Sequence, residues 1–316
     1  MKFVDSVLNL IGKTPMVRLN RLTNDIEADV LVKLEYFNPT GSLKDRIALR
    51  MIEQAEKDGA LKPGQTIVEA STGNTGIALS FVGTLKGYKV IIYETIPGKM
   101  GEEKIKIMKR YGAKVKLIRP GTDNMTGVSG AEVELPGRSM CLEMERKSPN
   151  IWWARQFSNP ANTAAHNETG REILSQTRGK VDAFIAAIGT GGTLKGVAEI
   201  LKAKLPRVKI IGVQPAGSKF SITPGEPYPK SDISGGIISE MLERDLVDEV
   251  VTVNDKDAIN MAHRLWSEEG LFAGISSGAN VLVAIKEAKA LGKGETVVTI
   301  LPDSGDRYLT EEHFVT

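Results

Sequence analysis

The sequence has little of what several common protein classes require. Its one cysteine, Cys141, cannot form an intramolecular disulfide, and its three histidines, His166, His263 and His313, lack the spacing of metal ligands. No apolar run approaches the roughly 20 residues of a membrane-spanning helix. The 41 basic and 39 acidic residues are interspersed and leave a net charge of +2. We therefore expect a cytoplasmic protein with no metal centre, no membrane segment and no nucleic-acid partner, in which Cys141 is packed in the interior.

Short β-branched segments alternate with helical segments along almost the whole chain. Strands are predicted at 65–70, 88–94, 113–119, 182–188, 208–214, 248–254 and 295–301. Helices are predicted at 43–59, 75–87, 101–112, 193–205, 256–270 and 277–291. Continuous apolar strands separated by helices of this length are typical of parallel sheets covered on both faces. The predicted fold class is α/β.

Two stretches interrupt this alternation. Residues 119–150 are rich in glycine, proline and serine and separate one series of strands and helices from the next, so we place a domain boundary near residue 150. Residues 215–240 contain four prolines and four glycines and form a segment too long for a simple connection. Both stretches are predicted to be irregular, apart from the helix-like residues 142–147.

Two glycine-rich loops follow predicted strands, at the strand ends where parallel sheets bind their ligands. The loop GTGGT, residues 189–193, can converge backbone N–H groups and two hydroxyls at a helix N-terminus, which suits a phosphate. A tight turn without a ligand fits the same residues. The loop STGNTG, residues 71–76, offers hydroxyl, amide and backbone donors that suit a carboxylate or a ring oxygen. The second loop is predicted to bind an amino acid.

The stretch NPTGSLKDR, residues 38–46, puts Lys44 in the first turn of a predicted helix, where the helix dipole disfavours a cation. A solvated lysine paired with Asp45 or Glu35 is one interpretation. The other is a lysine whose pKa is lowered by the helix dipole, so that its neutral amine can attack an aldehyde. A phosphate site, a carboxylate site and such a lysine together suggest pyridoxal phosphate.

With these features in place, the chain resembles the cysteine synthase family of fold type II pyridoxal-phosphate enzymes, which includes O-acetylserine and O-phosphoserine sulfhydrylases. The matching motifs follow one another along nearly the whole chain: IGKTPMVRLNRL, NPTGSLKDR, EASTGNTGIALS, QFSNPANTAAHNETGREI, IGTGGTLKG, GISSGAN and LPDSGDRYL. The resemblance implies two three-layer αβα domains with mostly parallel sheets. A smaller, mobile domain would span 36–150, and a larger domain that carries the phosphate loop would combine 12–35 with 151–316. The resemblance also implies a homodimer, and it leaves open whether a serine acetyltransferase docks on it.

The same resemblance implies roles for single residues. Lys44 would bind the cofactor as a Schiff base and act as the catalytic base, Asn74 would hold the ring oxygen, and Ser276 would face the pyridine nitrogen. The phosphate would be held by Gly189, Thr190, Gly191, Gly192 and Thr193. The substrate carboxylate would be bound by Ser71, Thr72, Gly73, Thr75 and Gln156.

The implied reaction is β-replacement on an activated serine, O-acetylserine or O-phosphoserine, with a sulfur nucleophile, which makes cysteine. Residues 228–242 lack the glycine-isoleucine-glycine signature of O-acetylserine enzymes, so the leaving group and the nucleophile stay open. Cystathionine, cyanoalanine or diaminopropionate synthesis and serine or threonine dehydration are alternatives on the same fold.

Two alternatives come from other classes of protein. A nucleotide-binding oxidoreductase that uses residues 189–193 is the remote one, and against it the strand 208–214 ends in Gln214 where an acidic residue would hold a ribose. The other is a non-catalytic binding module, which would not need Lys44.

Overall fold

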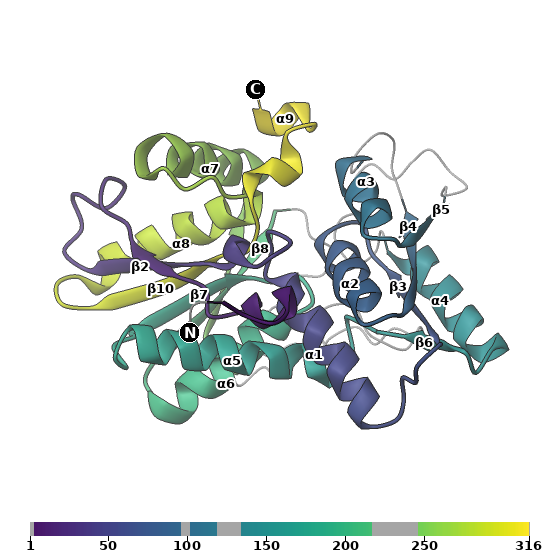
Figure 1. The fold of residues 1–316 in the computed structure, drawn as a ribbon. Coiled ribbons are helices and arrows are strands. Elements are labelled where there is room, and N and C mark those ends of the chain that lie inside the picture. The colour runs from purple at the N-terminus through teal and green to yellow at the C-terminus, as the bar shows by residue number, and fades with distance from the viewer. Residues whose placement is uncertain (1–2, 96–101, 119–133, 217–245, 316) are drawn as a thin grey trace.

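The computed structural model describes residues 3–95, 102–118, 134–216 and 246–315, which fold around two β-sheets (Figure 1). Among these residues, the larger sheet has six strands in the order β1 (Met16–Arg18), β2 (Asp29–Leu34), β10 (Thr296–Leu301), β7 (Ala183–Ala187), β8 (Lys209–Pro215) and β9 (Glu249–Val253). The smaller sheet has four, in the order β5 (Lys114–Ile118), β4 (Lys89–Thr95), β3 (Thr66–Ala70) and β6 (Ile151–Trp153). Of the described strand pairs, β1 with β2 is antiparallel and the others are parallel. The α/β class with mostly parallel sheets is confirmed.

Helices cover both faces of each sheet (Figure 1). On the larger sheet, α7 (Asp255–Glu269) and α8 (Ile275–Leu291) lie on one face, and α5 (Pro160–Gln176) and α6 (Gly192–Lys204) lie on the other. On the smaller sheet, α1 (Lys44–Lys57), α2 (Asn74–Leu85) and α3 (Glu102–Arg110) lie opposite α4 (Leu135–Lys147). The short helices are η1 (Val7–Leu10), η2 (Glu35–Phe37), η5 (Gly305–Tyr308) and α9 (Glu312–Val315).

The residues of the central strand β10 explain why helices cover both faces of the larger sheet. All its side chains are buried; Val297 and Leu301 contribute to the core beneath α7 and α8, while Val298 and Ile300 contribute to the core beneath α5 and α6. Alternate residues of a strand point to opposite faces, so buried apolar residues on both faces require a helix layer on each side. Within the described ranges, no helix is long and apolar enough to span a bilayer.

The predicted strands and helices are all present, with ends shifted by one or two residues. The sequence analysis missed β1, β2, β6 and α5. It was also wrong about 135–141, because the helix α4 begins at Leu135 and includes these residues together with the helix-like 142–147. Residues 119–133 of the stretch 119–150 lie outside the described residues, as do residues 217–240 of the second stretch and the whole of 228–242. The smaller sheet continues through Trp153, a few residues beyond the expected boundary at 150, because β6 pairs with β3.

Cys141 lies on α4 with its side chain fully buried, as predicted, and burial raises the pKa of its thiol.

Candidate active site

A cavity of about 440 Å³ opens where the carboxyl ends of the larger sheet's strands meet the first residues of α1 and α2. Its walls include the ends of β8 and β9, the turn after β10 and the start of α8. Of the predicted cofactor residues, all but Gly192 line it: Lys44, Asn74, Gly189, Thr190, Gly191, Thr193 and Ser276. The fold therefore brings together residues that are more than 200 positions apart in the sequence.

Lys44 is the first residue of α1 and is partly buried in the cavity wall. The loop before it is attached to the end of β10, since the Leu43 N–H donates to the Pro302 carbonyl at 2.9 Å. Gly41 has a φ of +83°, which favours glycine, and a Cβ there would lie 3.1 Å from the Arg307 guanidinium. This close packing fixes the direction in which α1 leaves the sheet.

The interpretation of Lys44 as a solvated lysine paired with a neighbouring carboxylate is wrong. Asp45 instead accepts the Thr40 N–H at 2.7 Å, and Glu35 binds the Arg46 guanidinium at 2.7 Å.

Burial lowers the pKa of Lys44, and the charges of Glu134 and Asp303 act in the opposite direction. The predicted direction of the shift is confirmed, with burial as its main cause in place of the helix dipole. A larger fraction of Lys44 is therefore a neutral amine than for a lysine in water.

The loop 189–193 connects β7 to α6 at the floor of the cavity. Gly191, the N-cap of α6, has a φ of +82°, so the tight turn that the sequence suggested is present. Gly189 is exposed, and a Cβ built on it would meet nothing within 4 Å. The loop thus combines a turn with an open side on which a ligand can approach the backbone of a helix N-terminus.

Asn162, on α5, supports this loop, although the sequence analysis gave it no role. Its Nδ2 donates to the Thr190 hydroxyl at 3.0 Å and to the Gln156 carbonyl at 2.8 Å. A Cβ built on Gly192 would lie 2.1 Å from Asn162 Oδ1, so the loop and α5 pack without space for a side chain. Gly192 therefore acts in packing rather than in lining the cavity.

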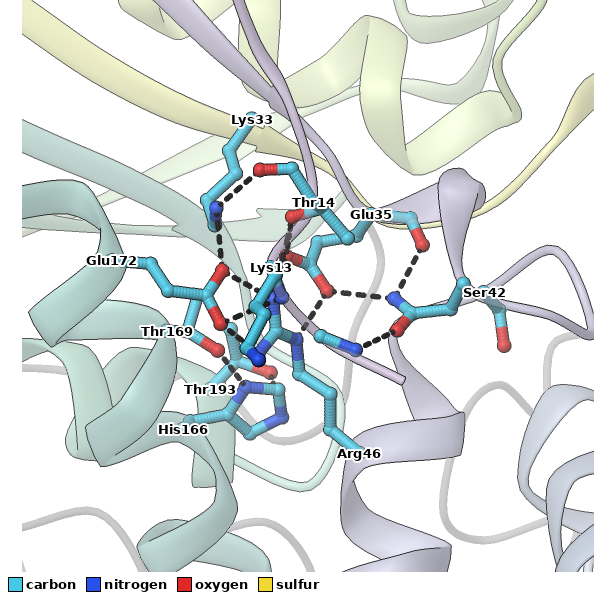
Figure 2. A network of polar contacts seen from close by, with 12 residues as sticks. Lys13, Thr14, Lys33, Glu35, Ser42, Arg46, His166, Thr169, Glu172 and Thr193 are labelled. Atoms are coloured by element: carbon cyan, nitrogen blue, oxygen red, sulfur yellow. Dashed lines mark hydrogen bonds and ion pairs between the residues drawn. The ribbon is translucent and has the colours of Figure 1, made fainter. Parts of the chain in front are cut away.

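His166, one turn further along α5, contacts the other end of the loop (Figure 2). Its Nε2 lies 3.1 Å from the Thr193 hydroxyl and its Nδ1 lies 3.2 Å from the Thr169 hydroxyl. Burial holds the pKa of His166 well below its usual range, so the ring is neutral, with one nitrogen donating and the other accepting. The spacing of residues 162, 166 and 169 on one helix face was the available sequence signal.

A buried ionic network joins the start of α1 to α5 (Figure 2). The Arg46 guanidinium binds the Glu35 carboxylate at 2.7 Å and the Glu172 carboxylate at 2.8 Å. Lys33 binds Glu172 at 2.8 Å and donates to the Thr14 carbonyl at 3.0 Å. Because Lys33 and Glu35 are fully buried, these charges depend on one another, and they hold α1 at a fixed position beside α5.

Asn74 begins α2 at the cavity and is tied to the turn after β10. Its Nδ2 donates to Asp303 at 2.6 Å, and the same carboxylate oxygen accepts the Tyr308 hydroxyl at 2.7 Å. The remaining oxygens, Asn74 Oδ1 and Asp303 Oδ1, are buried and have no hydrogen-bond partner among the described residues. Asp303 and Tyr308 lie in the motif LPDSGDRYL, but sequence reasoning assigned them no role.

The predicted carboxylate-binding residues lie together beside the cavity. The Ser71 hydroxyl accepts the Gly73 N–H at 3.2 Å, which shapes the loop 71–75. The Thr75 hydroxyl donates to Gln156 Oε1 at 2.6 Å, and Gln156 Nε2 donates to the Ala70 carbonyl at 2.9 Å. The fold thus brings Gln156 against this loop from 81 residues away.

An acidic side chain that the sequence analysis did not identify lies among these residues. Glu134 Oε1 accepts the Thr72 N–H at 3.1 Å, and Glu134 Oε2 accepts Gln156 Nε2 at 3.0 Å. No motif marks this residue, and its position depends on the helix α4, which the composition of 119–150 concealed.

The cavity fits a phosphorylated aldehyde with a polar aromatic ring. The Lys44 amine can bind the aldehyde, Gly189 leaves room for a phosphate, and the unpaired oxygens of Asn74 and Asp303 call for a polar ligand. Ser276, in the first turn of α8, adds a hydroxyl to the same wall. The fold and this site together define an α/β enzyme that uses a cofactor of this kind.

The comparisons with known proteins identify the cofactor and the family. The family model described as pyridoxal-phosphate dependent enzyme matches residues 7–303, so the chain belongs to this family and uses pyridoxal phosphate. A cysteine synthase of Staphylococcus aureus (strain N315) is 44% identical over 313 residues, which cover 98% of this chain and 96% of that protein. The resemblance to cysteine synthases is confirmed.

Solved structures agree with this assignment. A cysteine synthase of Entamoeba histolytica has a TM-score of 0.85 and 37% identity, covering 99% of this chain and 91% of that one. An O-ureido-L-serine synthase has a TM-score of 0.85 and 36% identity, covering 99% of this chain and 95% of that one. The two-domain αβα architecture of fold type II enzymes is therefore also the architecture of this chain.

Proposed function

We propose that this protein makes cysteine by pyridoxal-phosphate-dependent β-replacement, in which a sulfur nucleophile replaces the β-substituent of O-acetylserine or O-phosphoserine. The observation that carries the proposal is the meeting of Lys44, Asn74 and the loop 189–193 around one cavity, next to the loop 71–75. The named relatives support the sulfur chemistry, since two of them are cysteine synthases at 37% and 44% identity.

The cofactor would be held by residues from both sheets. The backbone and hydroxyls of 189–193 would bind its phosphate, Asn74 its ring oxygen and Ser276 its pyridine nitrogen, while Lys44 would hold its aldehyde carbon. When bound there, pyridoxal phosphate supplies an electron sink that acidifies the Cα–H of an attached amino acid. Ser276 would offer that nitrogen a hydroxyl and no negative charge of its own.

Lys44 would take the proton from Cα. Its lowered pKa supports this role, because a neutral amine is needed to accept a proton and burial raises the neutral fraction near pH 7.

The substrate carboxylate would be bound by Ser71, Thr72, Gly73, Thr75 and Gln156, through backbone N–H groups, hydroxyls and a carboxamide. Their convergence beside Asn74 supports this assignment, since it puts a carboxylate-binding surface next to the cofactor site.

The remaining proposals concern organisation. The division into a mobile domain, 36–150, and a larger domain, 12–35 with 151–316, is supported by the two separate sheets. A homodimer is supported by the exposed apolar side chains Phe3, Val7 and Leu10, with 76%, 39% and 52% of their surface accessible. A cytoplasmic location is supported by the free, buried thiol of Cys141.

A substrate panel tests the proposed function. The purified protein, loaded with pyridoxal phosphate, is given O-acetylserine, O-phosphoserine or serine together with sulfide, thiosulfate or homocysteine, and the amino-acid products are identified by mass spectrometry. We expect cysteine from sulfide with one of the two activated serines. Cystathionine from serine and homocysteine as the dominant product, or no replacement product in any combination, would overturn the assignment.

A further inference from the structure

Glu134 occupies the surface that the proposed function assigns to the substrate. Its side chain is 8% exposed, with Oε1 3.1 Å from the Thr72 nitrogen and 3.4 Å from the Thr72 hydroxyl, and Oε2 3.0 Å from Gln156 Nε2. We call these three donors, the Thr72 N–H, the Thr72 hydroxyl and the Gln156 carboxamide, the carboxylate cradle. A side-chain carboxylate thus makes the bonds expected for the α-carboxylate of an amino acid.

The backbone around Glu134 is held against the smaller sheet. The Arg138 N–H donates to the Glu134 carbonyl at 2.9 Å and closes the first turn of α4. A Cβ built on Gly137 would lie 3.0 Å from Ala70 Cβ and 3.2 Å from the Tyr93 carbonyl, so this turn lies directly on β3 and β4. The Glu134 side chain makes no capping hydrogen bond to α4, which leaves the cradle as its bonding partner.

Two carboxylates cannot share the cradle. Each of its donors that bonds Glu134 would be needed again by a substrate carboxylate, so the two carboxyl groups compete for the same hydrogen bonds. Burial already raises the pKa of Glu134 to about 8, and the charge of Glu69 adds to the effect, although the Thr72 N–H opposes it. The cradle therefore accepts one carboxylate at a time.

We propose that Glu134 is a specificity-determining residue that occupies the carboxylate cradle when no amino acid is bound and competes with the α-carboxylate for it. This inference rests on the proposed function, since it requires an amino acid to bind beside Asn74. Ligands that carry a carboxylate must displace Glu134, and ligands without one leave it in place. A ligand whose carboxylate binds the cradle more weakly than Glu134 does not displace Glu134.

The test compares two ligands that differ only by a carboxylate, L-alanine and ethylamine, neither of which has a β-leaving group. Each is titrated into the pyridoxal-phosphate-loaded protein, and Kd is read from the visible absorbance of the bound cofactor. The variants are Glu134→Gln, which keeps the length of the side chain and removes its ionisable group, and Glu134→Ala, which removes both side-chain oxygens. Glu143→Ala is the matched control, because Glu143 is on the exposed side of the same helix and pairs only with Lys147 among the described residues.

We expect both Glu134 variants to bind L-alanine about tenfold more tightly than the parent, the order expected for the net contribution of about one hydrogen bond. The Kd of ethylamine should stay within about twofold, and Glu143→Ala should match the parent for both ligands. Thermal unfolding of each variant verifies that the fold is intact.

Three results would overturn the inference, and they differ in what else they affect. Unchanged L-alanine binding in both folded variants, or an equal gain for ethylamine, would overturn the competition and leave the proposed function standing. A cofactor absorbance that no amino acid changes, in the parent or in any variant, would overturn the proposed function and the inference together.

Discussion

Valine substitutions at Gly192 and Gly189 separate the packing side of the loop 189–193 from its cavity side. A Cβ on Gly192 would lie 2.1 Å from Asn162 Oδ1 and 2.7 Å from its Cγ, so Asn162 would have to move. It would then lose its bonds to the Thr190 hydroxyl at 3.0 Å and to the Gln156 carbonyl at 2.8 Å. Two lost hydrogen bonds cost about 2 kcal/mol and overpacking adds about 1–3 kcal/mol. We expect Gly192→Val to lower the free energy of unfolding by about 3–5 kcal/mol.

The same substitution at Gly189 should behave differently, because a Cβ there meets nothing within 4 Å. We expect the free energy of unfolding to change by less than about 1 kcal/mol. The added methyl groups narrow the cavity where the phosphate is proposed to bind, so cofactor retention should fall. Urea unfolding of the cofactor-free proteins measures the first effect, and absorbance after dialysis measures the second. Equal stabilities of the two variants, or undiminished retention in Gly189→Val, would refute this reasoning.

Three further predictions concern charges. Arg46→Met should cost about 3–5 kcal/mol in urea unfolding because it leaves the fully buried Glu35 unpaired, whereas Arg264→Met, at an exposed pair, should cost less than about 1 kcal/mol; similar losses would contradict this. Burial raises the pKa of Glu134 to about 8, so Glu134 binds a proton more tightly in the folded protein than in the unfolded chain. The free energy of unfolding should therefore fall as pH rises from about 4.5 to about 8. Glu134→Gln should reduce that fall by a few kcal/mol, and an unchanged pH profile would count against the shift. Ser276→Ala should keep most β-replacement activity and Ser276→Asp should lose much more, because the carboxylate brings a charge to the pyridine nitrogen; equal turnover by the Asp variant and the parent would show that Ser276 does not face it.

Local patterns were enough to predict most of the fold. Strand β10 has four apolar residues among its six, and α8 contains the apolar run 281–285. Such a signal belongs to the segment itself and does not depend on the rest of the chain. The strands β1 and β6 are three residues long, too short for a periodic pattern to develop. The first part of the helix α4 was missed because Pro136 and Gly137 suggest a loop, whereas Pro136 lies at the helix start, where a proline needs no N–H partner.

The residues of the site also fall into those that local patterns predict and those that they do not. Lys44 and the loop 189–193 could be recognised because their own residue types suggest chemistry at strand and helix ends. No local pattern indicated Glu134. Asn162 and His166 share one helix face, but that spacing does not say which loop they contact. Their contacts join elements that are distant in sequence, which a linear pattern does not record.

The central claim is that Lys44 carries pyridoxal phosphate at this cavity. The direct measurement is to load the protein with the cofactor, reduce it with borohydride, digest it, and locate the modified lysine by mass spectrometry in the parent and in Lys44→Ala. We predict that the parent is labelled on the peptide containing Lys44, and that Lys44→Ala keeps its fold but carries no label. A label on another lysine of the parent, or an equally labelled Lys44→Ala, would contradict the account.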